Sequence, residues 1–469
     1  MSLNIGIFNA VTGLRASQTA LVTISANIAN ANTEGYSRKT IQFQSVELAG
    51  LGAGVAIAEV RRESSELLVR DSLAAGSGLE QRRTLESMLG RIETLFGGAN
   101  DDDSIGAAIG RFRDAMQKLA EQPENTGLQM ATVQRATEVT TLFNSIARQI
   151  QAQRLDAERG IDAGVQSINT EIENIDELNR KIAQLRGLGQ PTGDLEDKRD
   201  LAVKRISEEV NIQSYTREDG FMVIATGNGR VLVDSSGTYP VSFSPASFVG
   251  PTSPFDTIDV GGFDITGEIR SGRLAAYVDM RDTVLPAIYN ELNQLAQSLR
   301  TNVTATGLAT TNSAVDPGVD TNLLFVASSA TDFVGTLQVH PDLLANPALL
   351  AGTPTVDLQI SRDLADALTD TGYSFAAVPN GLPALTKSFE TYAQSILGEI
   401  ANRRAAAKAD FDYQETFAQA INAKLSSVSE VNIDEELSQL LVFQKSYAAA
   451  GRVIQTTNEM FDTLLGVIT

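Results

Sequence analysis

The chain of 469 residues contains no cysteine, no tryptophan and a single histidine. Thiol catalysis, disulfides and zinc sites built from cysteine or histidine are therefore excluded. No apolar run approaches the ~20 residues that a membrane-spanning helix needs. Basic residues are also few, because 37 lysines and arginines stand against 58 aspartates and glutamates, which gives a net charge of −21. Such a chain repels nucleic acid and anionic membranes, so we expect it to bind neither.

Both ends of the chain carry the same helical pattern. Apolar and small residues recur by alternating steps of three and four from Leu3 to Ala31 and from Leu437 to Ile468. This heptad spacing predicts two helices that pair as a coiled coil. Small or polar residues such as Ser17, Gln444 and Gly451 lie on the two stripes, so neither helix buries much apolar area alone.

We expect the two stripes to pack against each other or against neighbouring copies of the chain. The residues predicted to make these self-association contacts are Leu3, Ile7, Leu14, Leu21, Ile24, Ile28, Leu437, Tyr447, Ile454, Phe461 and Leu465.

Between the ends, the chain alternates from helix to strand and back to helix. No proline occurs from about residue 128 to 186, and a heptad seam at 161–182 predicts a helical rod of roughly 85–90 Å at 1.5 Å per residue. The glycine-rich loop at 187–193 should end the rod, and a further helix is expected near 195–210. Pro286 should kink or start a helix around 274–303.

Strand signals come from alternation and turn residues. Thr226-Gly227-Asn228-Gly229 separates two apolar runs and predicts a β-hairpin. A short strand is expected around Ile41, and Gly50-Leu51-Gly52-Ala53-Gly54 suggests the turn after it.

The predicted fold is therefore mainly α with an inserted β-rich domain. We expect a terminal coiled-coil assembly domain formed by 1–45 with 430–469, and a helical shaft formed by 46–210 with 375–429. An inserted β-containing domain would occupy 211–374 in the middle of the chain.

Several segments resemble proteins of the bacterial flagellum. Asn-Ile-Ala-Asn-Ala-Asn-Thr-Glu-Gly-Tyr-Ser-Arg at 27–38 resembles the N-terminal signature of rod, hook and hook-associated proteins. Asp-Leu-Glu-Asp-Lys-Arg-Asp at 194–200 and Gly-Glu-Ile-Arg-Ser-Gly-Arg-Leu at 267–274 resemble internal motifs of the hook-associated protein 1 family. The segments 427–436, 443–447 and 458–465 are similar to the C-terminus of that family. Glu430 stands where the family usually has glycine, so the turn there must form without it.

The resemblance implies a structural axial protein that joins the flagellar hook to the filament and seeds filament assembly, not an enzyme. A rod or hook subunit is the alternative, but such a subunit should lack the segments 194–200 and 434–436. A peptidoglycan-cleaving enzyme on a flagellar scaffold would need a carboxylate-bearing catalytic domain, and the sequence offers none.

The implied partners are copies of the chain, hook protein below, the next hook-associated protein above and a flagellar export chaperone. The expected location is the extracellular flagellum. Export should run through the flagellar apparatus without a cleaved signal peptide, because residues 1–6 have neither a basic nor an apolar signal region.

Three features suggest chemistry but have simpler interpretations. Asp101-Asp102-Asp103-Ser104 lacks the spaced ligands of a calcium loop and lies where a helix N-terminus favours acidic residues. His340 has no catalytic motif around it, and we interpret it as a loop histidine. Gly227-Asn228-Gly229 joins two strands and not a strand and a helix, so it does not indicate a dinucleotide site. We assign no catalytic residue, metal ligand or cofactor.

Overall fold

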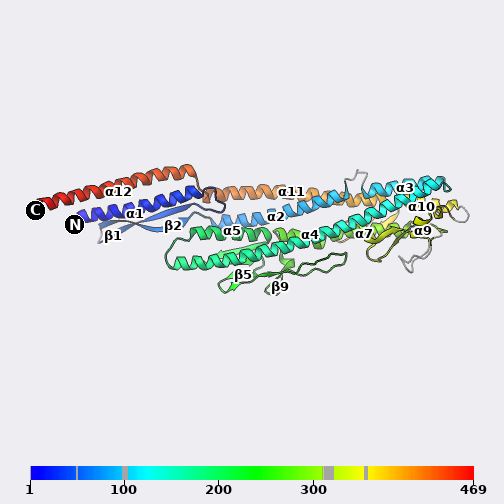
Figure 1. Cartoon of the computed structure of the whole chain (residues 1–469), viewed down its shortest axis with the longest axis horizontal. Helices are drawn as coiled ribbons and strands as arrows, with labels where there is room; N and C mark the ends of the chain where they lie inside the picture. The colour runs from blue at the N-terminus through cyan, green and yellow to red at the C-terminus, as the bar shows by residue number, and fades with distance from the viewer. Residues whose placement is uncertain are drawn as a thin grey trace.

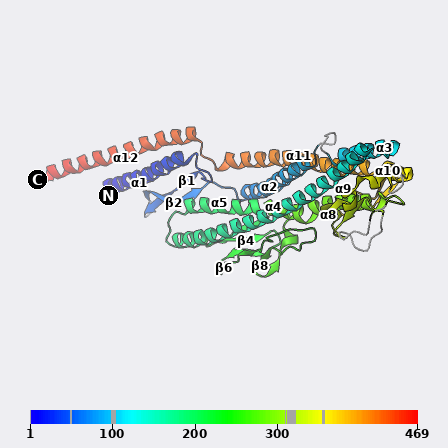
Figure 2. The same ribbon diagram turned by 45° about the vertical axis from the view of Figure 1, so that its right-hand side comes forward.

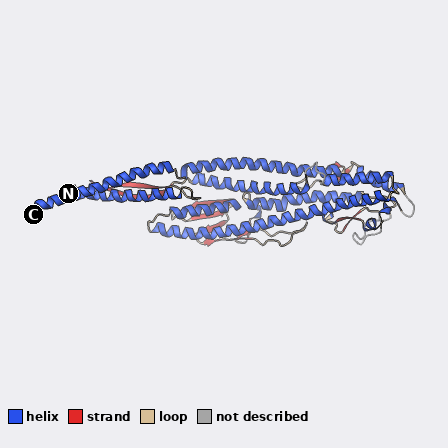
Figure 3. Ribbon diagram, turned by 45° about the horizontal axis from the view of Figure 1, so that its top comes forward, coloured by secondary structure: helices blue, strands red, loops and turns tan. Residues whose placement is uncertain are grey.

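Long helices run side by side along the molecule and give it an elongated shape, with both termini at the same end (Figure 1). The computed structural model describes residues 2–48, 51–97, 104–308, 310, 322–352 and 357–468. Helix dominates. A longer strand pair lies beside the terminal helices, and short strands lie near the middle of the rod and near its far end (Figure 3). No helix in these described ranges is long and apolar enough to cross a membrane.

The shaft is a bundle whose longest member has 62 residues, or about 93 Å at 1.5 Å per residue. Asn125 starts this helix by accepting hydrogen bonds from the backbone N–H groups of Gly127 and Leu128. The predicted rod and the loop that ends it near residue 190 are confirmed. The shaft helices are α2 (Glu66–Phe96), α3 (Ile105–Glu121), α4 (Thr126–Gly187), α5 (Gly193–Glu209) and α11 (Phe389–Ser429).

Ser104 is the N-cap of α3, and its hydroxyl accepts a hydrogen bond from the backbone N–H of Ala107. Asp101–Asp103, for which we expected a role at this helix N-terminus, lie outside the described residues.

The predicted hairpin around residues 226–229 is confirmed. The N–H of Gly229 donates to the carbonyl of Thr226 at 2.8 Å, and β4 pairs with β5 in antiparallel register. All of the strand pairs in the described ranges are antiparallel. One sheet has the order β3 (Ile212–Thr216), β4 (Met222–Thr226), β5 (Val231–Asp234), β6 (Gly237–Thr238), and a second has the order β7 (Val241–Ser242), β8 (Asp259–Val260), β9 (Phe263–Asp264). Two-stranded pieces are formed by β10 (Phe325–Ala327) with β11 (Leu337–Val339) and by β12 (Tyr373–Phe375) with β13 (Leu385–Lys387).

Short helices fill the rest of the middle segment. Pro286 lies in the first turn of its helix, as expected from its missing N–H. These elements are η1 (Thr266–Glu268), α6 (Arg273–Asp279), η2 (Met280–Val284), α7 (Leu285–Asn302), α8 (Phe333–Thr336), α9 (Pro341–Ala345), η3 (Pro347–Ala351) and α10 (Leu358–Thr369).

Buried apolar side chains form two clusters along the shaft. One joins α2, α3, the first half of α4 and α11 with α7 and α10. The other joins the second half of α4 with α5 and the sheets of residues 212–264, and it contains the predicted seam from Ile161 to Ile175. Much of 280–374, which lies within the predicted β-containing domain of 211–374, therefore packs against the shaft helices.

The terminal unit consists of α1 (Ser2–Asn30), β1 (Lys39–Leu48), β2 (Leu51–Arg62) and α12 (Ile433–Ile468). The helices α1 and α12 lie side by side, and the β1–β2 hairpin lies along α1 (Figures 1 and 2). The strand near Ile41 is confirmed. The turn over 50–54 is wrong from Leu51 onward, because 51–54 belong to β2. Gly54 has φ +100, and a Cβ there would lie 2.1 Å from the Thr12 hydroxyl, so glycine lets this strand approach α1.

Candidate assembly surface and its joint with the shaft

The predicted self-association residues divide according to the side of α1 or α12 on which they lie. Ile24 is buried, with 4% of its surface exposed, whereas Leu437 and Tyr447 are 46% and 40% exposed. The side chains of Leu3 and Leu465 lie outside the described residues. Those that are partly buried are Ile7, Leu14, Leu21, Ile28, Ile454 and Phe461.

Several apolar side chains of α12 face solvent, including the two exposed residues of the predicted set, Leu437 and Tyr447. A helix that exposes this much apolar area has a surface suited to a protein partner. The exposed residues are Leu437, Leu441, Val442, Tyr447, Val453 and Met460.

A buried polar network ties the start of α12 to the end of α1. The Asn27 amide donates to Glu436 Oε2 at 3.0 Å and to the Lys39 carbonyl at 2.9 Å. Glu436, 1% exposed, also accepts from Arg38 Nε at 2.8 Å. Tyr36 donates its hydroxyl proton to Asn27 Oδ1 at 2.9 Å. Each polar atom named here therefore has a partner, as burial requires.

Sequence reasoning missed this network, although its residues belong to the quoted motifs. The available signal was an amide, Asn27, next to the apolar stripe of α1, together with a carboxylate, Glu436, in the first turn of α12.

The joint between the terminal unit and the shaft is also polar. Asp197 on α5 accepts hydrogen bonds from Lys39 Nζ at 2.8 Å and from Arg62 Nη1 at 3.2 Å. It also accepts a hydrogen bond from the hydroxyl of Ser37. Arg62 donates to Asp200 as well, at 2.6 Å. The motif at 194–200 thus holds the segment at 37–39 and the end of β2.

The charges at this joint shift one another's pKa values. Burial alone would lower the pKa of Lys39, but hydrogen bonds to Asp194 and Asp197 raise it above its ordinary value. Burial raises the pKa of Asp200, and Arg62 opposes that rise. Ion pairing therefore keeps Lys39 charged where the chain is largely withdrawn from water.

The motif at 267–274 forms a second joint within the shaft. Gly272 has φ +88, and a Cβ at this position would lie 2.3 Å from the Glu209 carbonyl oxygen, so only glycine fits. The next residue, Arg273, forms ion pairs with Glu80, Glu208 and Glu209 at 2.7–3.0 Å and so connects α2, α5 and α6.

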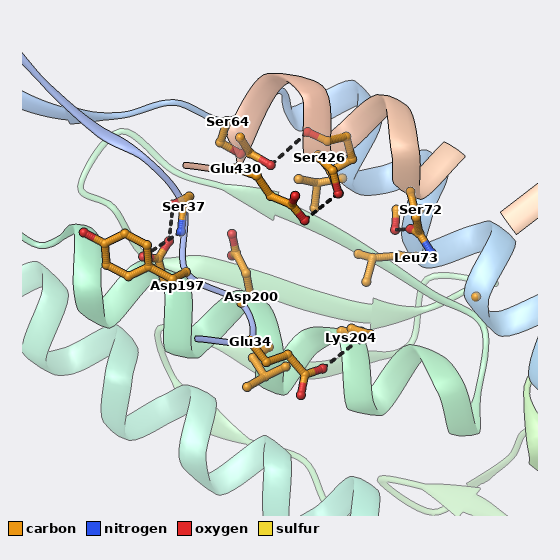
Figure 4. A pocket seen from close by; sticks show the side chains of 18 of the residues that line it. Glu34, Ser37, Ser64, Ser72, Leu73, Asp197, Asp200, Lys204, Ser426 and Glu430 are labelled. Carbon is orange, nitrogen blue, oxygen red and sulfur yellow. Dashed lines mark hydrogen bonds and ion pairs between the residues drawn. The ribbon is translucent and has the colours of Figure 1, made fainter. Parts of the chain in front are cut away.

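A cleft of about 290 Å³ lies at the joint, between the loop at 34–37 and helices α2, α5 and α11. Asp197, Asp200 and Lys204 line it from α5, and Ser426 and Glu430 line it from α11 (Figure 4). Glu430 has φ −80, so the chain leaves α11 without the left-handed conformation that would call for glycine.

No group of three or more His, Cys, Asp or Glu in the described ranges could hold a metal ion. His340 lies between β11 and α9, in neither element, as expected for a loop histidine, and it is the N-cap of α9. It is 3% exposed, and its Nδ1 accepts from the backbone N–H of Asp342.

Three family models match the chain. The Flagellar hook-associated protein FlgK helical domain matches residues 89–317. The Flagellar basal body rod FlgEFG protein C-terminal model matches 425–467, and the Flagella basal body rod protein model matches 7–36.

Curated relatives named Flagellar hook-associated protein 1 match over nearly the whole length. The protein of Escherichia coli (strain K12) is 23% identical over 98% of this chain and 99% of the relative. That of Salmonella typhimurium is 24% identical with the same coverage, and that of Bacillus subtilis (strain 168) is 23% identical over 98% of this chain and 97% of the relative. The flagellar hook junction protein FlgK from Burkholderia pseudomallei is a solved structure with a TM-score of 0.47 and 16% identity, covering 71% of this chain and 66% of that chain.

Proposed function

The chain belongs to the flagellar hook-associated protein 1 family, and we propose that it is a structural axial protein that joins the flagellar hook to the filament. In this role it would associate with copies of itself through α1 and α12 and seed filament assembly. The observation that carries the proposal is the terminal unit, in which α12 is held to α1 by a buried polar network and still exposes several apolar side chains.

The proposed neighbours are hook protein on one side and the next hook-associated protein on the other. A flagellar export chaperone would bind the chain before export through the flagellar apparatus. We propose no catalytic activity, since a scaffold of packed helices with ion-paired joints accounts for the motifs at 194–200 and 267–274.

A rod or hook subunit is the second candidate. The rod-protein models at 7–36 and 425–467 favour it, because they match the terminal segments that such subunits share. The helical-domain match at 89–317 favours the junction protein, because it covers α3, α4 and α5 of the shaft and the strands from β3 to β9.

The experiment is deletion of the gene followed by electron microscopy of the cells and assay of the medium for flagellin. A junction protein predicts hooks without filaments and flagellin released to the medium. Cells that lack hooks altogether would instead support a rod or hook subunit, and cells with normal filaments would contradict both proposals.

A further inference from the structure

The terminal unit shares no apolar core with the shaft. Neither cluster of buried apolar side chains includes a residue from the described parts of α1, β1, β2 or α12. The chain passes between the two parts only at 63–65 and 430–432. In two views of the molecule the terminal unit extends beyond the end of the shaft (Figures 1 and 2).

Polar contacts hold the two parts together instead. We define the polar clamp as Ser37, Lys39 and Arg62 of the terminal unit with Asp194, Asp197 and Asp200 of α5. Asp197 is its centre, because this single carboxylate contacts all three residues of the terminal unit. It is 6% exposed, so the contacts form where water competes little.

The surroundings of the clamp allow rotation. A close-packed apolar core resists movement, because separating it exposes apolar surface and leaves voids. Here the cleft of about 290 Å³ already separates the loop at 34–37 from α11, and many of the residues that line it are polar (Figure 4). Polar contacts across the joint therefore oppose tilting. They are the clamp contacts together with the Glu34–Lys204 ion pair at 3.1 Å and the hydrogen bond from the Arg38 N–H to the Ser429 carbonyl at 2.8 Å.

We infer that Asp197 is the positioning residue that fixes the angle between the terminal unit and the shaft, with the polar clamp acting as the latch of a hinge. The hinge goes beyond the proposed function, and only its consequence in the flagellum rests on that function. An axial unit held at one angle would present its exposed apolar side chains to its neighbours in one orientation.

The substitution Asp197→Asn should loosen the latch without unfolding the protein, because it removes the charge of the one carboxylate that Ser37, Lys39 and Arg62 share. Lys39 keeps an ion pair with Asp194 at 2.8 Å, and Arg62 keeps one with Asp200 at 2.6 Å, so neither cation is left buried without a carboxylate. Lys39→Met loosens the latch from the other side, because it removes the ion pair between Lys39 and Asp197. Asp197 is not left unpaired in this variant, since it keeps its contacts with Arg62 and Ser37. Asp176→Asn is the matched control, since Asp176 pairs with Arg180 within α4 and lies outside the joint.

The test is the distance between spin labels on the full-length chain. The chain has no cysteine, so Gln18→Cys on α1 and Gln419→Cys on α11 label two exposed positions across the joint, roughly 40 Å apart along the helix axes. A second pair, Thr170→Cys with Gln419→Cys, lies within the shaft and reports on the shaft alone.

We expect a narrow distance distribution across the joint in the parent and in Asp176→Asn, and a broad one in Asp197→Asn and Lys39→Met. The distribution within the shaft should stay narrow throughout. An unchanged distribution in Asp197→Asn, or a parent distribution as broad as that of the variant, would overturn the inference.

Loss of the main thermal transition in both clamp variants would also overturn it, since the clamp would then belong to the folded core. These distances do not depend on where the protein lies in the cell. The deletion experiment therefore tests the function separately from the hinge.

Discussion

Ile24→Asp should separate the role of the terminal unit from the stability of the shaft. Ile24 is 4% exposed on α1. Removing its apolar burial costs about 2–3 kcal/mol, and an unpaired buried carboxylate adds several kcal/mol. The total, on the order of 5 kcal/mol, is comparable to the whole stability of a small domain. The packing of α1 against its neighbours should therefore be lost.

The shaft should remain folded, because its two apolar clusters contain no described residue of the terminal unit. We expect the purified variant to keep its main thermal transition by circular dichroism, while cells that carry it fail to join filaments to hooks. Val22→Asp is the matched control, since Val22 lies on the same helix and is 64% exposed.

Two results would refute this reasoning. Loss of the main transition in Ile24→Asp would show that the terminal helices belong to the core of the folded monomer. Normal motility of cells carrying the variant would show that this seam is not needed for assembly.

Three further predictions concern buried groups. Burial raises the pKa of Glu291 to about 7 from 4.5, so the folded protein keeps a proton that the unfolded chain releases. The free energy of unfolding should therefore fall by about 3 kcal/mol between pH ~4.5 and ~7. Glu291→Gln should abolish this loss, as measured by urea unfolding at several pH values. The same dependence of stability on pH in parent and variant would contradict the assignment. Gly160→Ala places a Cβ 2.5 Å from the Tyr277 ring, which should destabilise the shaft by about 1–3 kcal/mol. Gly187→Ala is the control, because there is open space around Gly187, and it should leave the melting temperature of the protein nearly unchanged. Glu436→Ala removes the acceptor at the centre of the polar network of the terminal unit. Amide hydrogen exchange in α12 should therefore become faster, while exchange in α4 stays slow. Equal protection of α12 in parent and variant would argue against that network.

Local patterns predicted much of the secondary structure. The absence of proline from about 128 to 186 and the seam at 161–182 predicted α4, because helical periodicity and helix breakers act within a few residues. Turn chemistry predicted the hairpin at 226–229 for the same reason. Both terminal helices were also evident from their spacing, although their pairing as a coiled coil stays a prediction.

Long-range contacts could not be predicted in this way. The packing of α7 and α10 into the helical shaft depends on the whole topology, and no local pattern distinguishes it from packing against a separate β domain. The polar clamp joins Lys39 and Arg62 to Asp197, which follows them by more than 130 positions, so only the motif resemblance marked these segments. The glycines at 50–54 suggested a turn, but Gly54 instead allows β2 to lie close against α1.

The pH and exchange measurements test parts of the molecule, whereas the central claim is its place in the flagellum. Immunogold labelling of intact flagella with antibodies raised against the purified chain tests that claim most directly. We predict gold confined to a short segment between hook and filament. Gold distributed along the hook or the rod would contradict the account.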